Sequence, residues 1–159
     1  ERGIVDLDKE WPALAEAEKR LAETMADARA SARDRDWAQG VVEALSSGRA
    51  KPYAEVLIQV FRIGKAAIVF LPGEVFSGIG SAIRDAAGIP HLVTVAYANT
   101  CEIGYIPTAS AFPEGGYEVD SAPFYYGLFQ LTPDCEERIV AAAVDLLNGA
   151  TETSSSPSH

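Results

Sequence analysis

The first third of the chain carries an apolar pattern with helical spacing. Between residues 9 and 32, apolar side chains recur every three, four or seven positions, and Glu, Lys and Arg fill the positions between them. The recurring apolar residues are Trp11, Leu14, Leu21, Met25 and Ala28. Asp8 is the expected N-cap of this helix. A second stretch over 34–47 has the same spacing and ends before Gly48, a residue favoured just beyond a helix. The pattern predicts a helical hairpin arm.

From residue 54 onward the pattern changes to short apolar runs. Residues 56–71 contain two runs rich in β-branched and aromatic residues on either side of Gly64-Lys65, which predicts a β-hairpin. Residues 75–87 have helical spacing, and 91–98 form an apolar run that is typical of a buried strand. A last helical pattern covers residues 133–147.

The segment over 99–127 has no regular pattern and is rich in Gly, Pro and aromatic residues. A loop of this length in a compact domain is often functional. Together the elements predict an α/β (α+β) fold, in which a mixed β-sheet is flanked by helices. We expect a helical arm over 1–52, a sheet-containing part over 53–150 and a disordered Ser- and Thr-rich tail over 151–159.

Composition narrows the classes of function. The length of 159 residues fits one domain or part of a larger one, and 48% hydrophobic residues can build a packed core. The net charge is −10, and residues 56–159 carry eleven acidic but only four basic side chains. Such a surface excludes nucleic acid as a partner and disfavours an anionic membrane.

The chain lacks an apolar run close to the roughly 20 residues that span a bilayer, and it starts without a signal-peptide pattern. We therefore expect a soluble protein and leave a secreted or periplasmic location open. Because the sequence does not begin with Met, it is expected to start inside a longer product. Cys101 and Cys135 leave both a disulfide and free thiols open.

Two chemically competent side chains follow strand-like runs about thirty residues apart, Glu74 and Tyr105. The chain between them has room for one helix and one returning strand, so both would reach the same edge of the sheet. A carboxylate and a phenol that converge there indicate ligands of a hard metal ion or acid/base groups. Spacing alone favours structural roles, however: an acid is common in a first helical turn, and Tyr105 and Tyr117 can serve as aromatic packing. His91 and His159 are the only histidines, so other nitrogen ligands would come from elsewhere.

Three short motifs occur in order: Pro72-Gly73-Glu74, then Gly104-Tyr105-Ile106-Pro107-Thr108, then Gly116-Tyr117-Glu118. With them, the segment from Ile63 to about Gly127 resembles the neutral/alkaline (non-lysosomal) ceramidases and their shorter bacterial relatives. The resemblance implies the C-terminal portion of a larger catalytic domain. In that family two histidines, a glutamate and a tyrosine hold Zn²⁺, and a zinc-bound water attacks an amide carbonyl. By motif, Glu74 resembles the glutamate ligand, Tyr105 the tyrosine ligand and Tyr117 the tyrosine that hydrogen-bonds the developing oxyanion.

The zinc histidines of the family belong to an N-terminal part that this sequence does not contain, and His91 matches neither. The resemblance therefore implies a companion N-terminal chain that supplies them, and a small-molecule or lipid amide as substrate. Two alternatives stay open: a non-catalytic binding or scaffolding module that kept the fold without the metal, and a zinc hydrolase of another ester or cyclic amide. The helical arm is interpreted as a packing surface through which the chain could form a homo-oligomer.

Overall fold

The computed structural model describes residues 1–99, 103–126 and 129–152. They fall into two compact units. The sheet unit combines Glu1–Lys9 with the chain from Tyr53 onward, and the helical unit is Glu10–Pro52.

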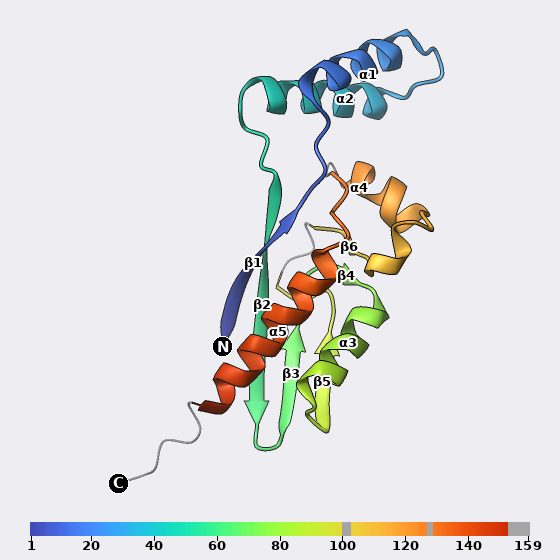
Figure 1. Cartoon of the computed structure of the whole chain (residues 1–159). Coiled ribbons are helices and arrows are strands. Elements are labelled where there is room, and N and C mark those ends of the chain that lie inside the picture. Colours follow the sequence, from blue (N-terminus) through green and yellow to red (C-terminus); the bar gives the residue numbers. More distant parts are fainter. Residues whose placement is uncertain (100–102, 127–128, 153–159) are drawn as a thin grey trace. The chain divides into compact units, whose positions relative to one another are not determined.

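The sheet unit is built on a four-stranded mixed sheet (Figure 1). Its strands, in spatial order, are β1 (Arg2–Asp8), β2 (Tyr53–Ile63), β3 (Ala66–Phe70) and β5 (His91–Val95). β2 pairs antiparallel with both β1 and β3, whereas β3 and β5 run parallel. The predicted hairpin over 56–71 is confirmed as β2 and β3, and Gly64 takes a φ of 62° in the turn between them. The mixed α/β class is likewise confirmed.

β1 was not among the predicted elements. Its residues alternate between solvent and core, but only Leu7 is fully buried, so the apolar signal is short and charged residues interrupt it. The expected helix N-cap Asp8 is wrong, because Asp8 is the last residue of β1 and lies opposite Tyr53. The expected arm over 1–52 therefore loses its first nine residues to the sheet unit.

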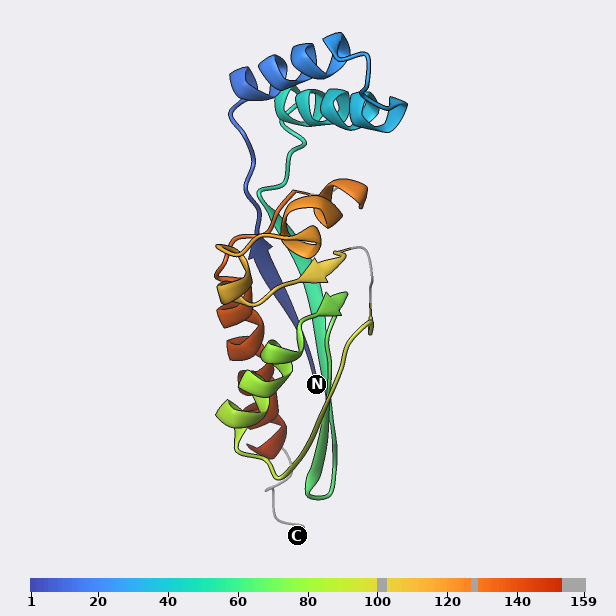
Figure 2. The ribbon, with the colours of Figure 1, turned by 90° about the vertical axis from the view of Figure 1, so that its right-hand side faces the viewer.

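Two helices cover one face of the sheet, α3 (Ser77–Ala87) and α5 (Cys135–Glu152), as Figure 2 shows. They pack against each other, and α5 also packs against β1 and β2. The helices and sheet share one apolar core, in which burial of each large aliphatic side chain contributes roughly 1.5–3 kcal/mol. Its fully buried members include Leu7, Ile58, Leu71, Ile79, Ile83, Ile139 and Leu147. The predicted end of α3 is confirmed, since Gly88 caps it with a φ of 60°.

The opposite face of the sheet is also apolar but exposed. Ile4, Phe61, Ile63 and Val93 are between 50% and 72% exposed. Phe61 is the cross-strand partner of Ile68, and Ile68 is the partner of Val93, so apolar side chains lie side by side across three strands.

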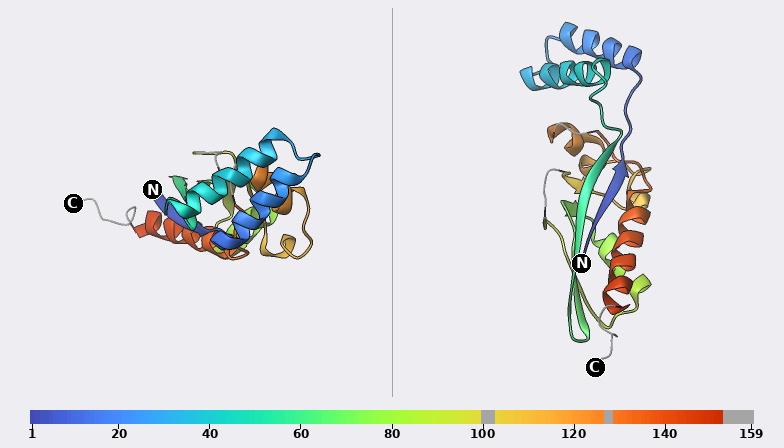
Figure 3. Two further views of the ribbon diagram at one scale, coloured as in Figure 1. Left: turned by 90° about the horizontal axis from the view of Figure 1, so that it is seen from above. Right: turned by 90° about the vertical axis from the view of Figure 1, so that its left-hand side faces the viewer.

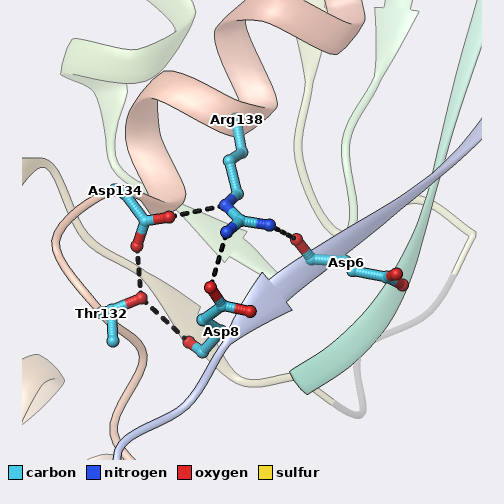
Figure 4. A network of polar contacts seen from close by, with 5 residues as sticks. All are labelled: Asp6, Asp8, Thr132, Asp134 and Arg138. Carbon is cyan, nitrogen blue, oxygen red and sulfur yellow. Dashed lines mark hydrogen bonds and ion pairs between the residues drawn. The ribbon is translucent and has the colours of Figure 1, made fainter. Parts of the chain in front are cut away.

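A polar network fastens β1 to the start of α5 (Figure 4). The guanidinium of Arg138 donates to the carboxylates of Asp8 and Asp134, both at 2.5 Å, and to the backbone carbonyl of Asp6 at 2.9 Å. The hydroxyl of Thr132 contacts the Asp134 carboxylate and the Asp8 carbonyl. The Arg138 side chain is 39% exposed, so solvent screens these ion pairs and each contributes little to stability. This network, the Arg138 clasp, joins the end of β1 to the start of α5. Asp8 therefore has a structural role as one of its two carboxylates.

The helical unit consists of α1 (Leu14–Ala26) and α2 (Ala32–Ser46), which lie side by side (Figure 3). The predicted first helix is shorter than expected, because the chain turns after Ala26 and Ser31 begins α2 with a capping box to Asp34. Only three of the described side chains in this unit are buried: Ala17, Ala38 and Val41.

The segment over 99–127, expected to lack regular structure, contains several short elements. They are β6 (Tyr105–Ile106), a 3-10 turn (Ala109–Ala111), a π-helical turn (Tyr117–Ser121) and α4 (Ala122–Tyr125). The final helix is confirmed as α5, and the expected tail lies from residue 153 outside the described residues. In the described part of the chain, the helices are too short or too polar to cross a membrane.

Candidate functional site

The predicted pair of Glu74 and Tyr105 meets in a second, two-stranded sheet. β4 (Glu74–Val75) runs parallel to β6 and places Glu74 directly opposite Tyr105. The Glu74 N–H donates to the Gly104 carbonyl at 2.7 Å, and the Phe76 N–H donates to the Ile106 carbonyl at 3.0 Å. Glu74 therefore lies in a strand and not in a first helical turn, which removes the helix-dipole explanation for its presence.

Glycine makes this close approach of two backbones feasible. Gly73 has a φ of +60°, and a Cβ atom there would lie 2.4 Å from the carbonyl oxygen of Gly104. Gly104 has a φ of +68°, which also favours glycine. The two motif glycines are thus needed for the β4–β6 pairing that brings the candidate side chains together.

The Glu74 carboxylate is surrounded by phenols. The hydroxyl of Tyr126 donates to Glu74 Oε1 at 3.2 Å, and the hydroxyls of Tyr97 and Tyr105 also hydrogen-bond this carboxylate. These bonds, that of Tyr97 first, lower the pKa of Glu74, although partial burial opposes them. The hydrogen bond to Glu74 raises the pKa of Tyr105 to about 12. At neutral pH the site therefore holds a carboxylate anion beside a neutral phenol.

Tyr117 lies next to this pair. It begins the π-helical turn after Gly115 and Gly116, whose φ angles of 68° and 114° are unfavourable for other residues. The ring centroids of Tyr117 and Tyr105 are 6.0 Å apart, with an edge-to-face angle of 80°. Tyr117 is 51% exposed, so about half of the residue is open to solvent. The structure thus brings all three predicted residues together, while their roles as ligands and donor stay predictions.

Sequence reasoning missed Tyr97 and Tyr126. Tyr97 falls within the run over 91–98 that predicted a buried strand, but β5 ends at Val95 and Tyr97 is 61% exposed. Tyr126 follows α4 in the aromatic segment. No spacing rule marks either residue, because both reach Glu74 through the tertiary fold.

The donors present can supply part of a metal site. Among the described residues there is no group of three or more His, Cys, Asp or Glu side chains that could hold a metal ion. His91 begins β5 opposite Ala66, at the start of β3, whereas Glu74 follows the end of β3. Cys135 is buried, and burial raises the pKa of its thiol to about 12, so it remains protonated; Cys101 lies outside the described residues. Glu74 and Tyr105 are hard oxygen donors, and they fit half of a four-coordinate zinc shell.

A small pocket borders the site on the Tyr105 side. Its apolar walls include Ile103, Pro107, Phe112, Phe129 and Leu131. Its volume of about 10 Å³ has room for about one water molecule.

The chain is similar to two solved ceramidase structures. The neutral ceramidase from Pseudomonas aeruginosa is 21% identical with a TM-score of 0.48, over 93% of this chain and 24% of that one. A ceramidase complexed with C2 is 22% identical with a TM-score of 0.43, over 64% of this chain and 15% of that one. The chain thus spans about a quarter or less of the structures that it matches. No protein-family model and no curated protein matches the chain.

Proposed function

We propose that this chain is the C-terminal part of a zinc-dependent amide hydrolase of the ceramidase type, with Glu74 and Tyr105 as two of the zinc ligands. The observation that carries the proposal is the parallel β4–β6 pairing, which sets a carboxylate and a phenol side by side. The three sequence motifs around Glu74, Tyr105 and Tyr117 support the same assignment.

Each residue has a distinct task in this proposal. A bound zinc ion supplies Lewis-acid activation of a water molecule and of the amide carbonyl. Glu74 is already an anion at neutral pH and needs no deprotonation to act as a ligand. Tyr105 gives up its phenolic proton when it becomes a ligand, which is disfavoured without a cation because its pKa is raised to about 12.

Tyr117 is proposed as the donor to the oxyanion that develops on the amide carbonyl. Its ring packs against that of Tyr105, and the residue is 51% exposed, so a substrate held beside Tyr105 would be within its reach. A hydrogen bond that forms only in the transition state accelerates the reaction without tightening substrate binding.

The remaining ligands are proposed to come from a companion N-terminal chain that carries two histidines. The described residues offer only oxygen donors around Glu74, and a zinc ion in a protein usually takes imidazole or thiolate ligands as well. The proposed substrate is a small-molecule or lipid amide, and we expect the chain and its companion to function outside the membrane.

The test measures zinc in the purified chain, alone and with its companion. We expect little zinc on the lone chain and about one equivalent in the assembly. In the assembly, Glu74→Gln and Tyr105→Phe should lower the zinc content, whereas Tyr53→Phe, on β2, should leave it unchanged. Tyr117→Phe should keep the zinc and lower kcat by about a hundred- to a thousand-fold.

Two results would contradict the proposal, and a third would change its substrate class. Stoichiometric zinc on the lone chain would mean that other ligands exist. An assembly without zinc or hydrolytic activity would favour the binding or scaffolding module, and zinc-dependent activity on esters or cyclic amides alone would redirect the substrate class.

A further inference from the structure

The Glu74 carboxylate has three phenol partners, two more than the proposed pair of zinc ligands requires. Tyr97, Tyr105 and Tyr126 all hydrogen-bond Glu74. The motifs account only for Tyr105. The other two phenols come from separate parts of the fold, one after β5 and one after α4, so their convergence needs an explanation.

Tyr97 reaches Glu74 from an unfavourable backbone conformation. Its φ is 56°, in the left-handed region that bulky residues rarely adopt. Two backbone hydrogen bonds hold it there. The Tyr97 N–H donates to the Gly73 carbonyl at 2.8 Å, and the Ala98 N–H donates to the Leu71 carbonyl at 3.0 Å. Tyr97 is thus anchored to the residue just before Glu74, and the cost of its conformation is offset by contacts on the Glu74 segment itself.

Asn99, two residues after Tyr97, has a similar backbone conformation. Asn99 has a φ of 69°, and its side-chain amide donates to the carbonyl of Leu57 at 3.0 Å. Asn tolerates this conformation better than Tyr does. Two left-handed residues, one on either side of Ala98, therefore follow β5, and the hydrogen bonds of this segment to Gly73, Leu71 and Leu57 hold Tyr97 beside the Glu74 segment.

Tyr126 reaches Glu74 from a different element, after α4. Its ring packs on Gly104, where an added Cβ atom would lie 2.8 Å from Tyr126 Cδ2. Since Gly104 precedes the Tyr105 ligand candidate, the Tyr126 ring lies on the β6 backbone and its hydroxyl meets Glu74 Oε1. Tyr97 and Tyr126 are 61% and 45% exposed, so burial does not explain where their rings lie.

We propose that Tyr97 and Tyr126 are positioning residues, which hold the Glu74 carboxylate in one orientation beside Tyr105. A partly buried glutamate without such partners samples several rotamers, and ordering them costs free energy when a ligand binds. A carboxylate has about four acceptor positions, so two hydrogen-bonded phenols leave room for Tyr105 or a cation. The orienting role stands on the hydrogen bonds alone; its benefit to a metal ion rests on the proposed function.

The test observes the Glu74 side chain directly, by NMR of the whole chain with ¹³C-labelled Glu at neutral pH. Glu74→Gln identifies the Glu74 signals by their loss. We expect one rotamer in the parent, read from its three-bond couplings and its separated methylene shifts. Tyr97→Phe and Tyr126→Phe, which each remove one oxygen and keep the ring, should weaken this preference, and the double variant should show averaged couplings. Tyr53→Phe is the matched control.

A purely structural role for the two tyrosines gives a different result. In that case the variants would lower the thermal midpoint while Glu74 kept its single rotamer, and the proposal would be overturned. The single variants serve if the double variant does not fold, and the backbone spectrum of β2 and α5 shows whether each is intact. A retained single rotamer in both folded single variants would also overturn it.

Zinc affinity separates this inference from the proposed function. In the assembly, loss of both hydroxyls should weaken zinc binding about 10- to 100-fold, as loss of outer hydrogen-bond partners typically does. If Glu74→Gln leaves zinc unchanged while the phenol variants still free the Glu74 rotamer, the ligand assignment fails and the positioning role stands.

Discussion

At the scale of single residues, the site is defined by two opposite pKa shifts, one on Glu74 and one on Tyr105. The pKa of Glu74 is lowered by its phenol donors, and that of Tyr105 is raised to about 12 by the carboxylate that it serves. Both shifts favour the same state, a charged carboxylate with a protonated phenol. The pair is therefore most stable between the pH at which Glu74 gains a proton and the pH at which Tyr105 loses one.

We predict that Glu74→Gln lowers the pKa of Tyr105 from about 12 toward the ordinary tyrosine value of about 10. The neutral amide no longer repels the phenolate, and it accepts a weaker hydrogen bond from the phenol. A titration into alkaline pH, followed by the absorbance of phenolate, measures this pKa. Comparison with Tyr105→Phe identifies which part of the absorbance change belongs to Tyr105. An unchanged titration in Glu74→Gln would show that Glu74 and Tyr105 are not coupled.

Glu74 and Tyr105 also make the free energy of unfolding depend on pH, at the acid end and at the alkaline end. The pKa of Tyr105 is higher in the folded state, so its stabilising contribution is present below pH 10 and is lost as the pH rises toward about 12. The pKa of Glu74 is lower in the folded state, so its contribution is present at neutral pH and is lost as acid protonates it. Urea unfolding across both ranges should show the two slopes in the parent and shallower slopes in the Glu74→Gln, Tyr105→Phe double variant, in which Asp134 and Cys135 still titrate with shifted pKa values.

At the scale of elements, the sequence predicted correctly those helices and strands whose own residues carry a strong local pattern. The hairpin over 56–71 and the helix ending at Gly88 have strong periodicity and turn residues. β4 and β6 have only two residues each. Strands this short carry no pattern of their own, and each one forms only by pairing with the other. The convergence of Glu74 and Tyr105 was predicted from motif spacing, whereas Tyr97 and Tyr126 needed the tertiary structure.

We predict that Gly73→Ala separates β4 from β6, whereas Gly88→Ala does not disturb the site. Both glycines have a φ of +60°, so both substitutions add similar left-handed strain of about 1–2 kcal/mol. At Gly88 a Cβ atom meets nothing within 4 Å, but at Gly73 it meets the Gly104 carbonyl at 2.4 Å. Gly73→Ala should therefore cost more in urea unfolding.

Comparing Gly73→Ala with Gly88→Ala isolates the free-energy cost of the steric clash, because both variants add one methyl group at the same backbone φ. Gly73→Ala should also return the pKa of Tyr105 toward its ordinary value, since the bond to Glu74 is lost with the strand pairing. Equal unfolding free energies for the two variants would mean that the β4–β6 contact is not tight.

At the scale of the whole molecule, the helical unit is an insertion within a β-hairpin. Asp8 at the end of β1 lies opposite Tyr53 at the start of β2, so the two strands are joined by everything between them. Residues 10–52 form their own compact unit with three described buried side chains. A helical hairpin with so small a core is marginally stable by itself. The apolar core of the sheet unit, by contrast, draws on β1, β2, β3, α3 and α5.

We predict that the sheet unit folds without the insertion. Replacing Glu10–Pro52 with Asn-Gly leaves a loop of about three residues after Asp8, a length that antiparallel strands tolerate. The Arg138 clasp on Asp8 and Asp134 remains, and it keeps β1 against α5. The shortened chain should unfold cooperatively in urea and keep the raised pKa of Tyr105. If the helical unit also mediates homo-oligomerisation, sedimentation should show a smaller assembly than the parent forms. A shortened chain that failed to fold, while the parent with a disrupted cap (Ser31→Ala) still folded, would show that the sheet unit depends on the insertion.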